Sequence, residues 1–348
     1  MPISEQELNR IVDQVLKNIQ QEKIVTAVKE SRSDSGSRPS TITSGQDGVF
    51  ADIDSAVEAA GKAQKQLIKL GFEKRKEIIA AMRKCALENA QSLAELAVSE
   101  TKMGRVADKK IKNVLVATKT PGVEDLPVTA QSGDESTEIM SYSPMGVILA
   151  ITPVTNPTAT VINNSISMIS AGNAVVFNPH PSAKNCTIET IRRLNRAIVT
   201  AGGPENLMTS VAEPTLRTSA ELMKHPKVNM IAATGGGGVV RAAMTAGKKV
   251  IAAGPGNPPV IVDETADLIS AAKFIVQGSA FDNNMPCVCE KELIVIRSVA
   301  DKLVNEMQKN GAYVQRTPPK EWPRIQPSLP KEDISVDFRS AQPEMLLV

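Results

Sequence analysis

The spacing of hydrophobic positions changes along the chain, and its first part is helical. Over residues 1–20, apolar side chains recur at i, i+3, i+4 and i+7, with charged and polar residues on the opposite face. Ser4 and Glu7 form the S-x-x-E pattern of a helix N-terminus. The pattern predicts an amphipathic helix that either docks into a partner's groove or packs on its own domain.

A polar segment separates this helix from the rest of the chain. Residues 30–48 are rich in Ser, Arg, Thr, Asp and Gly and have too little apolar surface to fold, so a flexible linker is expected over residues 21–48. From residue 50 to residue 102 the apolar positions return to helical spacing. This stretch is therefore predicted to be helical.

Beyond residue 102 short apolar runs alternate with helical stretches. The helical stretches cover residues 159–170, 186–200 and 239–246. Strands are predicted at residues 147–151, 174–177, 207–211, 228–232 and 249–252. This alternation predicts an α/β fold with a mostly parallel sheet covered by helices on both faces.

The loops that follow these strands are the expected place for chemistry, because parallel sheets bind ligands at the carboxyl ends of their strands. Loops 152–158, 178–182, 234–238 and 254–259 consist largely of Gly, Pro, Thr and Asn. The four-glycine run at 235–238 opens a helix, so its backbone N–H groups can face a pyrophosphate. It matches no Walker or G-x-G-x-x-G motif. A single glycine run is commonly a plain turn, and the prediction of nucleotide binding rests on the four loops together.

Composition narrows the class of protein. The 348 residues allow two domains. Forty basic and 38 acidic residues give a net charge of +2, and aromatic residues make up 3%, which argues against nucleic-acid or anionic-membrane partners. Neither a signal sequence nor a transmembrane run is recognised in the sequence. These features predict a cytoplasmic protein with reduced thiols.

The cysteines contain the main candidate for chemistry. Cys85, Cys186, Cys287 and Cys289 have no metal-site spacing, and no metal is expected. Cys287 lies in a loop with Asn and Pro neighbours, before the β-like run 293–296. Because a thiolate is both a nucleophile and a leaving group, such a thiol suits a two-step acyl transfer. The alternative is a small packing residue, which is the usual role of cysteine and the expected one for Cys289.

Further motifs match a known family. The chain resembles the CoA-acylating aldehyde dehydrogenases of bacterial microcompartments, the propionaldehyde and acetaldehyde dehydrogenases of propanediol and ethanolamine utilisation. The resemblance covers about residues 50–312, with matches at 120–125, 152–158, 162–167, 171–174, 179–181, 203–206, 234–238, 254–259, 262–267 and 281–290. It implies an aldehyde-dehydrogenase-like fold, with a Rossmann-type NAD-binding domain at 49–259. Residues 260–314 would begin a catalytic domain that carries the nucleophile loop.

The resemblance also implies roles for individual residues. Cys287 would attack an aldehyde, and the oxyanion would be held by the Asn156 side-chain amide and the Cys287 N–H. Hydride would pass to NAD, and coenzyme A would take the acyl group. His180 would bind a ribose or phosphate, or else face solvent in a turn. The expected cofactor-binding residues are Thr152, Pro153, Val154, Thr155, His180, Pro181, Thr234, Gly235, Gly236, Gly237, Gly254 and Gly256.

A missing carboxylate favours a thiol acceptor over water. Hydrolytic relatives carry a water-activating glutamate in the loop that here reads Gly-Pro-Gly-Asn at 254–257. A thiol, with a pKa near ~8.5, needs less activation than water. The nearby Glu290 and Glu292 are expected to be solvated. The sequence does not determine whether acetaldehyde or propionaldehyde is the preferred substrate. It also does not determine whether the cofactor is NAD or NADP.

The family also implies partners and a location. Residues 1–19 resemble the short helices that direct such enzymes to a microcompartment shell, so the protein is expected inside a microcompartment. Full-length members are expected to form homo-oligomers.

Family members are longer than this chain, and residues 315–348 are predicted to be an aberrant or disordered tail. A C-terminally truncated catalytic domain would expose the apolar faces of residues 271–277, 293–296 and 299–307. Weak or absent turnover is therefore expected. The alternative function is a non-catalytic remnant that binds nucleotide and docks in a microcompartment.

Overall fold

The computed structural model describes residues 46–313. The predicted helix at 1–20, most of the linker at 21–48 and the tail at 315–348 therefore lie outside the described residues. Within the described part, no helix is long and apolar enough to span a membrane.

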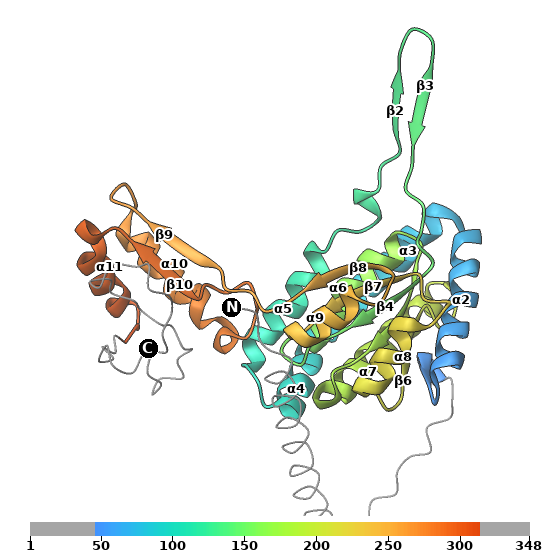
Figure 1. Ribbon diagram of the computed structural model, residues 1–348, viewed down its shortest axis with the longest axis horizontal. Helices are drawn as coiled ribbons and strands as arrows, with labels where there is room; N and C mark the ends of the chain where they lie inside the picture. Colours follow the sequence, from blue (N-terminus) through green and yellow to red (C-terminus); the bar gives the residue numbers. More distant parts are fainter. Residues whose placement is uncertain (1–45, 314–348) are drawn as a thin grey trace, which may run out of the picture. The chain divides into compact units, whose positions relative to one another are not determined.

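A six-stranded parallel sheet forms the centre of the fold (Figure 1). Its strand order is β1-β6-β5-β4-β7-β8, and each of its pairs is parallel. The five neighbouring strands β6-β5-β4-β7-β8 follow the 3-2-1-4-5 order of a Rossmann-type sheet. In this order the chain adds strands on one side of β4 first and then, from β7, on the other side. The strands are β1 (Val49–Phe50), β4 (Val147–Ile151), β5 (Ala174–Asn178), β6 (Met208–Val211), β7 (Met230–Thr234) and β8 (Lys249–Ala253).

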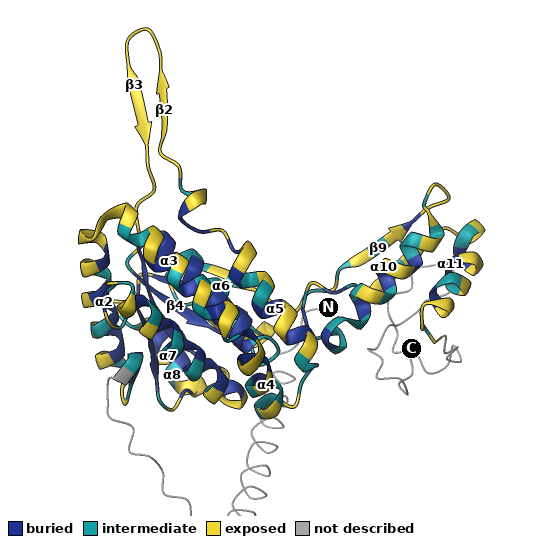
Figure 2. Ribbon diagram, turned by 180° about the vertical axis from the view of Figure 1, so that it is seen from behind, coloured by how far each residue is buried: buried dark blue, intermediate teal, exposed yellow. Residues whose placement is uncertain are grey.

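The central strands are buried along their whole length. Every residue of β4 and β5 is buried, and Leu149 pairs with Val176 on one side and Ile231 on the other (Figure 2). Such continuous apolar runs are typical of parallel strands covered on both faces. The predicted parallel sheet is confirmed, although β7 lies two residues later than the sequence indicated, at Met230–Thr234 instead of 228–232.

Helices cover both faces of this sheet (Figures 1 and 2). The predicted helical stretch at 50–102 divides into three helices, the first of which is capped by the Asp52 carboxylate accepting from the Ser55 N–H at 2.8 Å. The helices are α2 (Ile53–Lys69), α3 (Gly71–Glu88), α4 (Ala90–Thr101), α5 (Val106–Lys119), α6 (Pro157–Ser170), α7 (Lys184–Thr200), α8 (Leu216–Lys224) and α9 (Gly237–Met244). Short 3₁₀ turns are η1 (Gln46–Gly48), η2 (Val123–Asp125), η3 (Pro181–Ala183) and η4 (Phe281–Asn284).

A second, smaller hydrophobic core follows the sheet in sequence. Strands β9 (Pro259–Val262) and β10 (Glu292–Val295) pair in parallel, and α10 (Leu268–Ala280) packs with α11 (Arg297–Lys309). The buried members of this core are Val262, Ala272, Ile275, Leu303 and Met307. A domain boundary between residues 259 and 260 stays a prediction; β9 begins at Pro259.

The predicted exposure of the second core is correct for only part of two segments and wrong for the third. Within 271–277, Ala272 and Ile275 are buried in this core. Phe274 on α10 and Ile294 on β10 are 64% and 54% exposed. The expected exposure of the apolar face at 299–307 is wrong, because Leu303 and Met307 are buried in the core between α11 and α10. The apolar face of α11, which was predicted to be exposed, therefore packs against α10.

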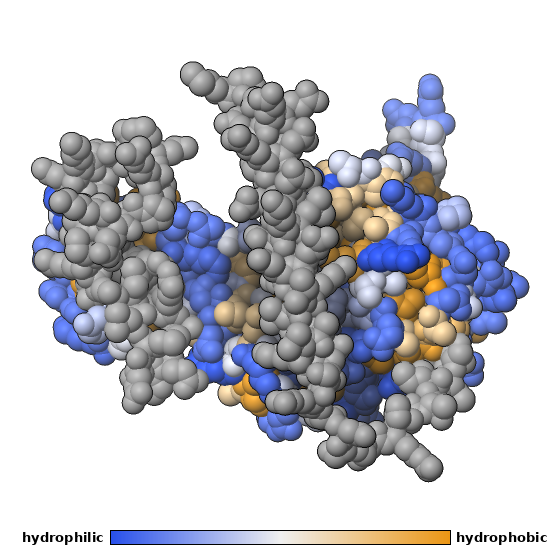
Figure 3. Space-filling view, turned by 60° about the horizontal axis from the view of Figure 1, so that its bottom comes forward, coloured by the Kyte–Doolittle hydropathy of each residue, from blue (hydrophilic) through white to orange (hydrophobic). Residues whose placement is uncertain are grey.

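An antiparallel hairpin was not predicted. Strands β2 (Thr129–Ser132) and β3 (Thr137–Met140) pair with each other, and every residue in them is exposed (Figure 2). The apolar Ile139 is 71% exposed. On the main body, Figure 3 shows hydrophobic side chains at the surface among hydrophilic ones. A hairpin that buries neither face lacks the alternation by which strands are recognised in a sequence.

Candidate active site

The loop after β4 lies next to the point where the strand order reverses. It contains the predicted residues Thr152 to Asn156, and Asn156 is the N-cap residue of α6. Thr152 is 2% exposed, and its hydroxyl oxygen has no hydrogen-bond partner among residues 46–313. The Asn156 amide nitrogen donates to the Thr155 hydroxyl at 3.0 Å, while its oxygen accepts from the Lys112 ammonium at 2.5 Å. This loop therefore presents a fixed carboxamide and an unpaired buried hydroxyl.

The turn before Cys287 has an unusual backbone. Asp282, Asn283 and Asn284 have φ values of 47°, 56° and 56°, in the left-handed region. That region costs about 1–2 kcal/mol per L-residue, and Asp and Asn tolerate it best after glycine. The Asn284 side chain holds the turn by donating to the carbonyls of Ser279 at 2.7 Å and Glu290 at 3.1 Å.

A buried carboxylate ties this turn to α5. Asp282 is 0% exposed and accepts hydrogen bonds from the ammonium groups of Lys109, at 3.2 Å, and Lys112. Its other oxygen accepts from the Arg105 backbone N–H at 2.7 Å, and its own N–H donates to Asp108 at 2.9 Å. Because Lys112 also contacts Asn156, one lysine connects the loop after β4 to the turn of Cys287.

Cys287 itself is half-buried and lies against the loop after β8. A Cβ added to Gly256 would come within 2.1 Å of the Cys287 carbonyl oxygen, so glycine permits this close approach. Within the described part of the chain, the Cys287 backbone N–H has no hydrogen-bond acceptor. The structure thus brings together the turn of Cys287, the loop of Gly256 and, through Lys112, the carboxamide of Asn156.

The other cysteines are placed for packing. Cys289 is 6% exposed, and burial raises the pKa of its thiol. Cys186 on α7 is fully buried, which raises its thiol pKa, and burial also raises the pKa of Cys85 on α3. A raised thiol pKa lowers the thiolate fraction and so the nucleophilicity.

The two glutamates near the cysteine turn are engaged elsewhere. Glu292 is exposed, but its carboxylate accepts from the Asn257 amide at 2.5 Å. Glu290 packs so closely on Gly278 that a Cβ there would lie 2.0 Å from its carboxylate. Glu292 therefore places a carboxylate against loop 254–257, which has none of its own. The loop sequence alone does not reveal this contact.

Several of the predicted nucleotide-binding residues lie in open loops, whereas Thr152 is buried and Thr234 ends strand β7. Gly236 is the N-cap residue of α9, and a Cβ at Gly236, Gly237 or Gly238 would meet no atom within 4 Å. These positions leave room for a phosphate at the helix N-terminus. His180 is exposed, and its Nδ1 accepts from the Ser182 N–H at 3.1 Å, so the neutral ring carries its proton on Nε2. Desolvation lowers the pKa of His180, which favours this neutral form.

Sequence reasoning missed Lys109, Lys112 and Asp282. On α5 the expected arrangement is inverted: Lys109 and Lys112 are 2% and 8% exposed, whereas Ile111 and Leu115 are each 54% exposed. Hydrophobicity alone would place these side chains the other way round. The run Asp-Asn-Asn before Met-Pro-Cys is the available signal, since those residue types favour a left-handed backbone.

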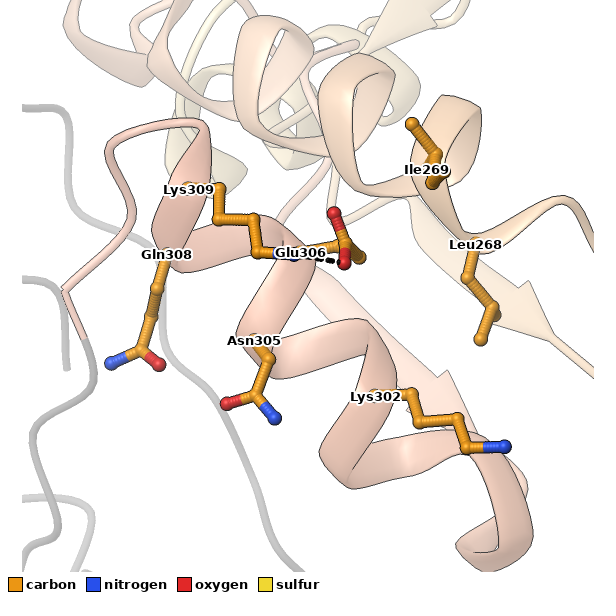
Figure 4. A pocket seen from close by; sticks show the side chains of 7 residues that line it. All are labelled: Leu268, Ile269, Lys302, Asn305, Glu306, Gln308 and Lys309. Atoms are coloured by element: carbon orange, nitrogen blue, oxygen red, sulfur yellow. Dashed lines mark hydrogen bonds and ion pairs between the residues drawn. The ribbon is translucent and has the colours of Figure 1, made fainter.

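A pocket between α10 and α11 is not the site (Figure 4). Its one carboxylate, that of Glu306, is paired with Lys309 at 2.5 Å, and it contains no thiol. It is lined by Leu268, Ile269, Lys302, Asn305, Glu306, Gln308 and Lys309. None of the predicted site residues lies there.

Cys287 is half-buried and lies beside a carboxyl-end loop of a Rossmann-type sheet, and ligands bind at this edge of open α/β sheets. The aldehyde dehydrogenase family model matches residues 30–324. The chain therefore belongs to the aldehyde dehydrogenase family. Its fold is that of the acylating aldehyde dehydrogenases, as the following relatives show.

The acetylating acetaldehyde dehydrogenase of Salmonella typhimurium is 48% identical over 311 residues, covering 89% of this chain and 65% of that protein. A propionaldehyde dehydrogenase structure from a Clostridium phytofermentans fucose-utilisation microcompartment has 49% identity and a TM-score of 0.75, covering 76% of this chain and 61% of that one. The Rhodopseudomonas palustris propionaldehyde dehydrogenase, solved with bound CoA and an acylated cysteine, has 47% identity and a TM-score of 0.75, covering 77% and 62%. The chain thus spans less than two thirds of the length of these relatives.

Proposed function

We propose that this chain oxidises a short aldehyde with NAD and transfers the acyl group to coenzyme A through a thioester on Cys287. The observation that carries the proposal is the joining of the Asn156 carboxamide and the Cys287 turn through Lys112 and Asp282. The Rhodopseudomonas palustris relative, with its bound CoA and acylated cysteine, supports the same chemistry.

The first half-reaction forms the thioester. The Cys287 sulfur bonds to the aldehyde carbon, and the carbonyl electron pair moves to oxygen. The Asn156 amide and the free Cys287 N–H would donate to this oxyanion, as two donors of an oxyanion hole. NAD, when bound, accepts the hydride that leaves the carbon. The oxidised carbon stays bound to Cys287 as an acyl thioester.

The second half-reaction transfers the acyl group without oxidation. The sulfur of CoA bonds to the acyl carbon, the bond to Cys287 breaks, and Cys287 leaves as a thiolate. The 254–257 loop contributes no carboxylate of its own. This arrangement supports a thiol acceptor, because water needs a base to attack at neutral pH.

The open loops fit the nucleotide. The helix dipole and free N–H groups at the start of α9 suit a pyrophosphate, with Gly235, Gly236 and Gly237 allowing close approach. The Nε2–H of His180 can donate to a ribose or phosphate oxygen.

The function is tested by incubating the purified 348-residue chain with NAD and either acetaldehyde or propionaldehyde, with and without CoA. We expect repeated turnover to NADH and acyl-CoA only when CoA is present, and at most one NADH per chain without it. This turnover should be slow, because apolar residues of the second core such as Phe274 and Ile294 are exposed. Carboxylate formed without CoA would instead identify a hydrolytic enzyme. Nucleotide binding with no turnover in either condition would contradict the catalytic proposal. It would favour the alternative function, a non-catalytic protein that binds nucleotide.

We also propose that residues 1–19 dock to a microcompartment shell, placing the protein inside the compartment. The amphipathic sequence pattern and the microcompartment origin of the Clostridium phytofermentans relative support this. Residues 1–48 fused to a fluorescent protein should form puncta in shell-producing cells. Leu16→Glu, on the apolar face, should make the signal diffuse, while Lys17→Glu, on the polar face, should not. Diffuse fluorescence of the unaltered fusion would refute the proposal.

A further inference from the structure

The buried side of α5 carries two cations that the chemistry described so far does not use. Lys112 places its ammonium between the Asn156 carboxamide oxygen, at 2.5 Å, and the Asp282 carboxylate. Its side chain is 11% exposed. Burying a lysine is costly unless its charge is paired and its donors are used. Asp282 provides that pairing and Asn156 takes a second hydrogen bond.

The neighbouring lysine fixes the same loop by its backbone. Lys109 donates to the Thr155 carbonyl at 2.8 Å and shares the Asp282 carboxylate at 3.2 Å. Both residues of the Thr155–Asn156 pair are therefore held by α5. Asp282, the anion between the two cations, belongs to the turn that precedes Cys287.

These contacts determine how the Asn156 carboxamide is oriented. A cation can only donate, so the amide oxygen must face Lys112 and the amide nitrogen must face away. The nitrogen has two hydrogens, and one of them is used by the Thr155 hydroxyl at 3.0 Å. The second hydrogen is left for an oxyanion. A charge-assisted bond to the oxygen also polarises the amide and strengthens its N–H donors.

We propose that Lys112, in its charged form and paired with Asp282, is a positioning residue. It orients and polarises the Asn156 carboxamide as an oxyanion donor. The inference rests on the proposed function, since Asn156 has this role only if Cys287 attacks a carbonyl. Lys112 itself touches neither the substrate nor the reacting atoms. Its effect on the reaction passes entirely through Asn156.

The inference is tested on one half-reaction that needs no NAD. When acetyl-CoA acylates Cys287, the bond from the acyl carbon to Cys287 forms, its bond to CoA breaks, and CoA leaves as a thiolate. This step passes through an oxyanion. Alkylation of Cys287 by iodoacetamide uses the same thiolate but forms no oxyanion. Both rates are measured at Cys287 by mass spectrometry of the intact chain and its peptides.

Lys112→Met is expected to slow acylation about 100-fold, the usual effect of losing one oxyanion donor. Alkylation should stay within about twofold, because the thiolate is unchanged. Asn156→Ala should slow acylation similarly, and the double variant should be no slower than Asn156→Ala alone. Lys112→Arg, which keeps a charged donor, should retain more acylation than Lys112→Met. Equal slowing of both reactions, or additive effects in the double variant, would overturn the inference.

The unaltered chain gives a second readout that needs no variant. Burial, and then the charge of Lys109, lower the pKa of Lys112 to about 8, against the opposing effect of Asp282. Asp108 on α5, Arg105 at its N-cap and the Cys289 thiol are the other titratable groups around this cluster. Lys112 is charged below this pH and neutral above it. The ratio of acylation to alkylation should therefore fall as the pH rises through about 8, and a flat ratio would contradict the inference.

The same measurements separate the inference from the function on which it rests. If the unaltered chain is alkylated but never acylated, the proposed function fails and the inference falls with it. If the chain is acylated and only Asn156→Ala slows the reaction, the function stands and the role of Lys112 is refuted.

Discussion

Replacing Cys287 with alanine is expected to abolish acylation of the chain by acetyl-CoA. The proposed reaction stores the acyl group on this sulfur, and alanine provides no atom to carry it. Removing the nucleophile from an enzyme that uses covalent catalysis costs about 10⁶-fold in turnover. Intact-mass measurement should show an acyl adduct on the unaltered chain and none on Cys287→Ala.

Cys85→Ala is the matched control for this experiment. Both cysteines are free and half-buried, but Cys85 lies on α3, and burial raises its thiol pKa. Its removal should leave the adduct unchanged. An adduct that persists in Cys287→Ala, or disappears in Cys85→Ala, would place the nucleophile elsewhere.

The largest loss of stability is expected for Asp282→Ala. This change leaves Lys109 and Lys112 buried together without their shared anion and removes the acceptor for the Arg105 backbone N–H. Breaking a buried ion pair by removing one partner costs about 3–5 kcal/mol. The free energy of unfolding, measured by urea titration, should fall by about this amount.

Asp134→Ala provides the comparison, because Asp134 lies in the exposed β2–β3 hairpin. Surface substitutions of this kind change stability by about 0.5 kcal/mol or less. Equal midpoints for the two variants would show that the buried cluster does not stabilise the fold. A fall seen only in Asp282→Ala would show that its anion is needed to bury the two lysines.

The sequence predicts the sheet well because its strands leave a local signal. The strands β4 and β5 are buried on both faces, so each is a run of consecutive apolar residues that can be recognised in the sequence. The exposed hairpin leaves no such signal, and the apolar run of β9, Pro-Val-Ile-Val, is only four residues long. Their pairing depends on contacts and chain direction that local spacing does not encode.

The candidate site is predicted in part for the same reason. Cys287 and the glycine loops belong to compact motifs, so the sequence alone selects them as candidates. The cluster of Lys112 and Asp282 joins residues 170 positions apart, and neither residue is unusual in its own segment. Hydrophobic spacing on α5 even points the wrong way, since Ile111 is exposed and Lys112 is buried.

The left-handed run from Asp282 to Asn284 also limits how this chain can diversify. Three successive backbone positions exclude β-branched and bulky side chains, and Asp282 must in addition carry the anion that two cations share. Few substitutions satisfy both demands, so the peptide leading to Cys287 has little freedom to vary. New substrate preferences would have to arise from side chains on other segments, while this turn keeps the thiol in one place.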